Sequence, residues 1–128
     1  DGRMIFGKTS ELLGASSALL LNALKELAGI PHENHVISPE AIRPIQEFKT
    51  KYLGSRNPRL HTDETLIALS VSAASNPEAR LALEQLHTLK GCQAHASVML
   101  SSVDIWEFRK LGIELTCEPK FEKEKIYH

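Results

Sequence analysis

The stretch TSELLGASSALLLNALKELAG, residues 9–29, decides the fold of this chain. Leucine and alanine fill most of its positions, so apolar side chains surround nearly the whole circumference of the helix that it predicts. A helix of this kind is typical of a protein core, and the other elements are expected to pack around it. Thr9 or Ser10 is predicted to cap its N-terminus, and Gly29 followed by Pro31 to end it.

The length of 128 residues predicts a single domain over residues 1–128. Its hydrophobic content of 42% and charged content of 24% are ordinary for a globular protein. A formal net charge of −1 argues against a nucleic-acid partner, and the longest apolar run, Ala18–Leu21, is too short to span a membrane. Cys92 and Cys117 are too few for a metal cluster, and they favour a cytoplasmic protein.

Short strands are predicted at residues 3–6, 35–37, 93–100 and 113–117. Between them lie helices that are predicted to begin at Ser38, Thr62, Asn76 and Ser101 or Ser102. Pro44 lacks an amide hydrogen, so the first of these helices is expected to kink there or to begin near Arg43 instead. The final strand, helix and strand are predicted to form a crossover unit. The expected fold is therefore α/β, a small mixed sheet of about four strands with helices packed on its faces and with helix outweighing strand.

Residues 2–9, GRMIFGKT, satisfy the expression of a phosphate-binding P-loop. Met4, Ile5 and Phe6 are bulky and apolar where such a loop wraps phosphate, so they fit a strand better. A weaker prediction remains, because free amides at a helix N-terminus attract anions. Lys8, Thr9 and Ser10 are therefore predicted to contribute to an anion site.

The connector SRNPRLH, residues 55–61, leads directly into the helix that is expected to begin at Thr62. Between Arg43 and His61 the chain has five basic residues and one acid, Glu47, which gives a local balance of +4. Guanidinium groups beside free helix amides suit bidentate recognition of phosphate or carboxylate. Arg56, Arg59 and His61 are therefore predicted anion ligands, although a solvated loop is the simpler alternative.

Histidines outside this connector offer less specific signals. His32 and His35 are three residues apart rather than the four that a helical zinc-protease motif requires, so no metal site is predicted. His61 and Asp63, with His95 on a predicted strand, are candidates for acid–base catalysis if they converge. The sequence identifies no cofactor and leaves open whether the protein is an enzyme.

Several segments together resemble a known family: residues 7–30, 37–45, 82–95, 111–119 and above all YLGSRNPRLHTDETLIALS, residues 52–70. The chain is similar throughout to the C-terminal region of the bacterial proteins grouped as domain of unknown function 1846. Members are much longer, so the resemblance implies an α/β C-terminal domain that has lost a larger N-terminal partner, in a cytoplasmic setting. The family has no established activity. Some members are labelled ATP-dependent peptidases, which neither residues 2–9 nor the spacing of His32 and His35 supports.

Two functions follow from these observations. In the first, the domain helps to bind a phosphorylated or carboxylated small molecule at the interface with the N-terminal domain. Lys8, Thr9, Ser10, Arg56, Arg59 and His61 would then gather at one place. In the second, the domain is structural, binds no ligand and mediates self-association as a homo-oligomer.

Overall fold

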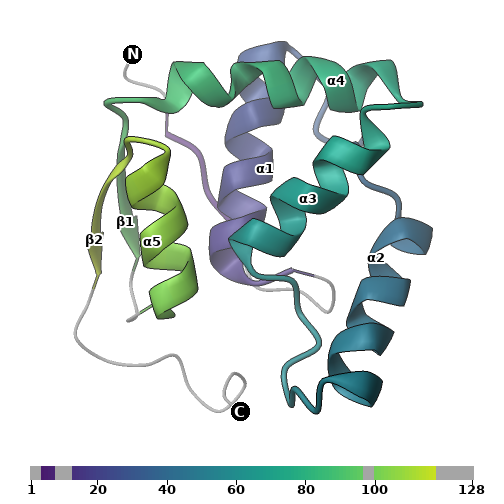
Figure 1. Ribbon diagram of the computed structural model, residues 1–128. Coiled ribbons are helices and arrows are strands. Elements are labelled where there is room, and N and C mark those ends of the chain that lie inside the picture. Colours follow the sequence, from purple (N-terminus) through teal and green to yellow (C-terminus); the bar gives the residue numbers. More distant parts are fainter. Residues whose placement is uncertain (1–3, 8–12, 97–99, 118–128) are drawn as a thin grey trace.

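The computed structural model describes residues 4–7, 13–96 and 100–117, and it is built around one central helix (Figure 1). That helix is α1 (Ala15–Ala28). The remaining elements are α2 (Pro39–Glu47) with a π-helical turn η1 (Phe48–Tyr52), α3 (Thr62–Ser72), α4 (Pro77–Glu84) with a 3-10 turn η2 (Gln85–Leu89), β1 (Gln93–Ala96), α5 (Ser102–Lys110) and β2 (Glu114–Cys117).

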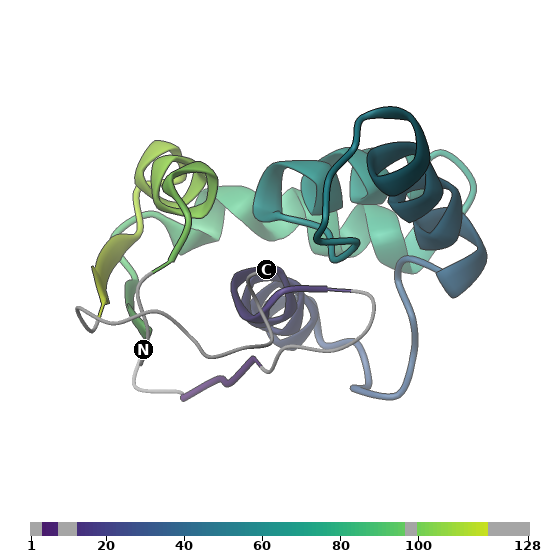
Figure 2. The same cartoon turned by 90° about the horizontal axis from the view of Figure 1, so that it is seen from below.

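The other elements lie on different sides of α1. Seen from below, α5 and the strands lie toward one side of α1, α2 lies on the opposite side, and α3 occupies the space between them (Figure 2). The core is continuous across these elements, and its largest fully buried apolar side chains are Leu20, Leu24, Leu60, Leu69 and Phe108. In the part of the chain that is described, every helix is too short or too polar to cross a bilayer.

The prediction that α1 forms the core is confirmed, but its predicted start is wrong. α1 begins at Ala15 with Gly14 as its N-cap, rather than at Thr9 or Ser10. The chain enters the helix in an extended form, because Leu13 forms an isolated parallel β-bridge with Leu60. Lys8, Thr9 and Ser10 lie outside the described residues.

The helix boundaries that depend on local signals are largely confirmed. The side chains of Ser38, Asn76 and Ser101 accept hydrogen bonds from backbone amides in the first turns of α2, α4 and α5. Gly29 ends α1 in the left-handed conformation (φ 73°). Ser38, Asn76 and Ser101 each supply a hydrogen-bond acceptor to the first turn of a helix, and Gly29 supplies the positive φ with which α1 ends.

The expected sheet of about four strands is wrong. Within the described residues there is one two-stranded sheet, in which β1 and β2 pair in parallel with Gln93 opposite Glu114. The crossover prediction is confirmed, since α5 joins the two strands. Val36 and Ile37 do not form the strand that was predicted over residues 35–37. Their backbone is irregular, and their apolar side chains are buried in the core.

The described residues 4–7 also form no strand, and they lie against α1 instead. The Asn22 side chain donates a hydrogen bond of 2.7 Å from Nδ2 to the carbonyl oxygen of Phe6. Gly7 approaches the helix so closely that a Cβ atom placed on it would lie 2.2 Å from the backbone nitrogen of Leu19. Only a residue without a side chain fits at that distance.

We therefore expect Gly7→Ala to reduce the free energy of unfolding by about 1–3 kcal/mol, the range for overpacked sites. Gly14→Ser is the matched control, because a Cβ there would lie 3.8 Å from the carbonyl oxygen of Leu60. Serine is a good N-cap, so this control is expected to leave stability equal or slightly higher. Urea denaturation measures both. Equal stability of Gly7→Ala and the parent chain would contradict the close approach.

Candidate functional site

The basic connector between η1 and α3 is folded by its own hydrogen bonds. The Ser55 hydroxyl donates to the carbonyl oxygen of Asn57 (3.2 Å), and the Asn57 side chain accepts from the amide of Arg59 (3.0 Å). Short polar side chains that bind nearby backbone in this way are typical of ordered turns. The connector therefore presents its arginines from a defined backbone.

Leu60, at the end of the connector, joins the start of α1 to the start of α3. Its carbonyl oxygen accepts hydrogen bonds from the Gly14 amide (3.3 Å) and from the Ser17 hydroxyl (2.9 Å). The beginning of α1 thus lies beside the connector. Gly7 and Leu13, which are described, both lie near the first turns of α1.

Carboxylates of the protein itself occupy the N-terminus of α3. Asp104 Oδ1, on α5, accepts from the amide of Thr62 (3.0 Å) and from its hydroxyl (2.9 Å). Glu64 Oε1 accepts from the His61 amide (2.8 Å), and Asp63 Oδ1 accepts from the Glu64 amide (2.8 Å). Negative charge is favoured at this end of a helix. The amides that were expected to be free beside the arginines are therefore largely engaged.

A buried lysine fixes the connector from its other end. Lys49, in η1, is 5% exposed, and its Nζ donates to the carbonyl oxygen of Arg59 (2.7 Å) and to Glu64 Oε1 (2.8 Å). A buried cation needs such partners, because desolvation of an unpaired charge is costly. Sequence analysis missed Lys49, although it follows Ile42 and Ile45 at the spacing of a buried helix face.

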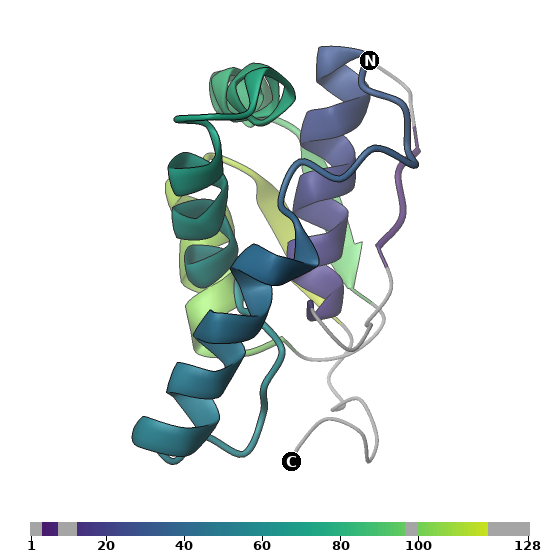
Figure 3. The same ribbon diagram turned by 90° about the vertical axis from the view of Figure 1, so that its right-hand side faces the viewer.

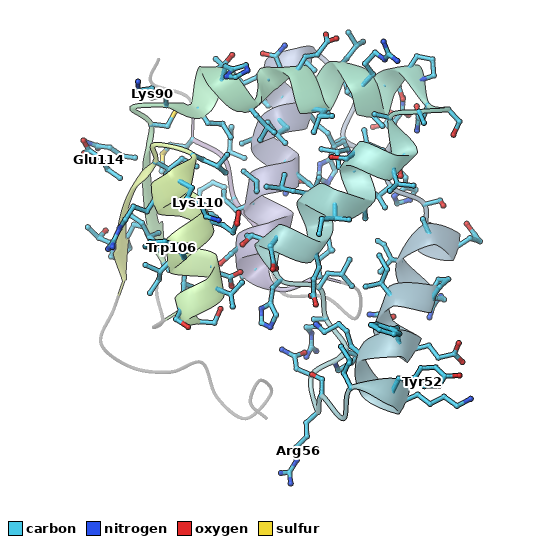
Figure 4. The ribbon with its side chains drawn as sticks, in the orientation of Figure 1. Tyr52, Arg56, Lys90, Trp106, Lys110 and Glu114 are labelled. Atoms are coloured by element: carbon cyan, nitrogen blue, oxygen red, sulfur yellow. The ribbon has the colours of Figure 1, made fainter. Side chains whose placement is uncertain are left out.

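The predicted anion ligands differ in their surroundings. Arg56 is exposed and extends from the connector away from the helices (Figure 4). Arg59 and His61 are half-buried, and His61 Nδ1 lies 3.9 Å from Asp104 Oδ1. The three residues belong to one short connector. Their ligand role remains a prediction.

The candidate acid–base residues occupy different parts of the fold. His95 lies on β1, where its Nδ1 is 2.6 Å from the Thr116 hydroxyl of β2. His61 and Asp63 lie at the start of α3, and α5 stands between that helix and the strands (Figures 1 and 2). Across residues 4–7, 13–96 and 100–117, no three His, Cys, Asp or Glu side chains are grouped as metal ligands would be. His61 and Asp63 therefore share one helix end, whereas His95 lies on a different element.

Asp104 is the second residue that sequence analysis missed. Its position three residues after the Ser101 cap indicates only a favourable charge in the first turn of α5. Its bonds to Thr62 join residues 42 apart in the chain. No local pattern in the sequence marks that pairing.

Comparison with known proteins shows to which family the chain belongs. The model of the C-terminal domain of unknown function DUF1846 matches residues 1–127. The chain belongs to this family. It is 59% identical over 127 residues to a UPF0371 protein of Corynebacterium glutamicum, 60% to one of Corynebacterium efficiens and 46% to one of Streptococcus uberis. Each alignment covers 99% of this chain but 26% of the relative, so the chain spans about a quarter of the length of these family members.

A second polar cluster lies at the far end of α1. Lys25 is buried, and its Nζ donates a hydrogen bond of 2.6 Å to the carbonyl oxygen of His32. Burial lowers the pKa of Lys25 below the usual 10.5, and the charges of Glu33 and Glu78 oppose that change. Asn34 links the cluster to α4, since its Nδ2 lies 3.1 Å from Glu78 Oε2.

We expect Asp104→Ala to lower the free energy of unfolding by about 1–3 kcal/mol, because Thr62 loses an acceptor for two buried donors. Asp104→Asn is the matched control, since an amide oxygen still accepts from the Thr62 amide and hydroxyl. It is expected to lose clearly less stability. Chemical denaturation compares the two. A loss as large for Asn as for Ala would contradict a capping role and point to the charge of Asp104 instead.

The lowered pKa of Lys25 predicts that the free energy of unfolding depends on pH, and Lys25→Met is expected to remove this dependence. With the folded pKa below 10.5, the unfolded chain binds more protons than the folded chain between the two pKa values, so stability rises with pH there. The difference in unfolding free energy between the parent and Lys25→Met should be constant below the folded pKa. It should then move in favour of the parent up to about pH 10.5. Urea titrations over this range measure it. A difference that moves the other way would contradict the lowered pKa.

Proposed function

We propose that this domain binds a phosphate or carboxylate group of a small molecule at its interface with the preceding part of a longer cytoplasmic protein. Arg56, Arg59 and His61 would be its ligands. The observation that carries the proposal is the ordered basic connector, which presents Arg56 to solvent beside the half-buried Arg59 and His61. Ordered loops hold ligand-binding residues in many proteins.

Charge supports this choice of ligand. The segment from Arg43 to His61 contains five basic residues and one acidic residue, Glu47. Lys49 is paired with Glu64 and turned inward, whereas Arg56 is exposed. Guanidinium groups recognise oxyanions through two parallel hydrogen bonds, so two neighbouring arginines suit phosphate or carboxylate.

The proposed recognition relies on side chains rather than on helix amides. Asp104, Asp63 and Glu64 already accept hydrogen bonds at the start of α3, so the backbone amides there are largely engaged. Lys8, Thr9 and Ser10 are proposed as a second group of ligands. They precede the segment that lies beside Leu60.

The length of the relatives supports an interface location. Since this chain corresponds to a quarter of those proteins, a ligand held by the connector can also meet residues from the other three quarters. A peptidase reaction is not proposed, because neither residues 2–9 nor the spacing of His32 and His35 supports one.

The test is calorimetric titration of the full-length protein with nucleotides, sugar phosphates and dicarboxylates. Arg59→Ala and Arg56→Ala are each expected to weaken binding about 10- to 100-fold, the value of a charged hydrogen bond. Arg80→Ala is the matched control, since Arg80 is an exposed arginine on α4. Unchanged binding by both connector variants, or no heat with any ligand, would contradict the proposal.

A further inference from the structure

One end of α2 projects from the domain and carries exposed apolar side chains. We call residues 39–54, which comprise α2, η1 and the two residues after η1, the arm. Figure 3 shows the arm reaching beyond the other helices, and Figure 4 shows Tyr52 directed outward from its end. Phe48, Tyr52 and Leu53 are 53%, 69% and 66% exposed. These three side chains, which we call the arm tip, come from six consecutive residues.

The arm changes its helix type at the arm tip. α2 contains Pro44, which lacks an amide hydrogen, and the helix continues as a π turn in which the Leu53 amide donates to the carbonyl oxygen of Phe48 (3.2 Å). Lys49 faces inward from this turn, whereas Tyr52 and Leu53, three and four residues further on, remain outside. In a continuous α-helix residues at these spacings share a face. Single π turns often mark functional sites.

The arm tip is held in place rather than loosely attached. The Lys49 Nζ atom is bonded to the carbonyl oxygen of Arg59 and to Glu64, and the Ser55 amide donates to the carbonyl oxygen of Lys49 (2.9 Å). The rings of Phe48 and Tyr52 lie 6.0 Å apart. A surface whose backbone is already ordered loses little conformational entropy when it docks.

We infer that the arm tip docks onto the part of the polypeptide that precedes this domain in the full-length protein. The relatives carry about three quarters of their length outside the matched region, and the matching model is the C-terminal one. A tethered neighbour meets the arm at a high effective concentration, which favours it over any free partner. Docking would remove three large apolar side chains from water.

The tether, rather than charge, separates this occupant from a second copy of the chain. The exposed charges of the arm balance, since Arg43 and Lys51 are matched by Glu40 and Glu47. The exposed Arg56 follows the arm in the connector and adds one positive charge. The surface that receives the arm is therefore expected to be apolar at its centre. The inference stands without anion binding, because it rests on the apolar side chains.

The first test places a photocrosslinking residue, p-benzoylphenylalanine, at Tyr52 in the full-length protein. Illumination and peptide mass spectrometry are expected to find crosslinks within one molecule, between position 52 and residues that precede this domain. The same probe at Leu81 is the control, because Leu81 is an exposed residue of α4, at the other end of the domain (Figure 1). Crosslinked dimers at position 52, or yields no higher than at position 81, would overturn the inference.

The second test measures coupling between the domain and the rest of the protein. If the arm docks, the full-length protein unfolds in one calorimetric transition, and the double variant Tyr52→Ser, Leu53→Ser separates it into two. The control Leu81→Ser is expected to keep one transition. A single transition in the double variant, or separation in both variants, would overturn the inference. Anion titrations of the same variants report on the connector independently.

Discussion

The hydrogen bonds at Leu60 and Thr62 hold the beginnings of three helices at one point. The carbonyl oxygen of Leu60 binds the start of α1 through Gly14 and Ser17, and two residues later Thr62 binds Asp104 of α5. Leu60 and Thr62 are buried, so a polar group left without a partner here would be costly. The position of the connector, and hence of its arginines, depends on this junction.

The same junction explains how charge is distributed over the domain. Carboxylates turn toward the start of α3, where the helix dipole and the free amides favour them. Lys49 is turned inward and paired with Glu64, whereas Arg43, Lys51 and Arg56 stay exposed on the arm and the connector. Arg56 of the connector thus follows closely in the chain after the exposed rings of Phe48 and Tyr52. Basic and apolar groups are thus brought together at the end of the domain from which the arm projects.

Much of the fold could be predicted because many helix ends are local structures. Ser38, Asn76 and Ser101 cap the helices that directly follow them, so the residues needed for each prediction are adjacent in the sequence. Strands were harder, because a strand exists only if a second segment pairs with it. Val36 and Ile37 have the composition of a strand, yet their side chains are buried in the core without any strand pairing. In the candidate site, composition identified a basic connector, but it did not reveal that Asp104 occupies the neighbouring helix end.

The sequence by itself determined the buried central helix, the caps of α2, α4 and α5, the crossover from β1 to β2 and membership of the family. Each depends on neighbouring residues or on an extended match along the chain. Only the tertiary structure decided where α1 begins, which carboxylates engage the start of α3 and which side chains of the arm face solvent. These features depend on contacts such as Leu13 with Leu60 and Thr62 with Asp104, and a contact between distant residues leaves no periodic trace in a single sequence.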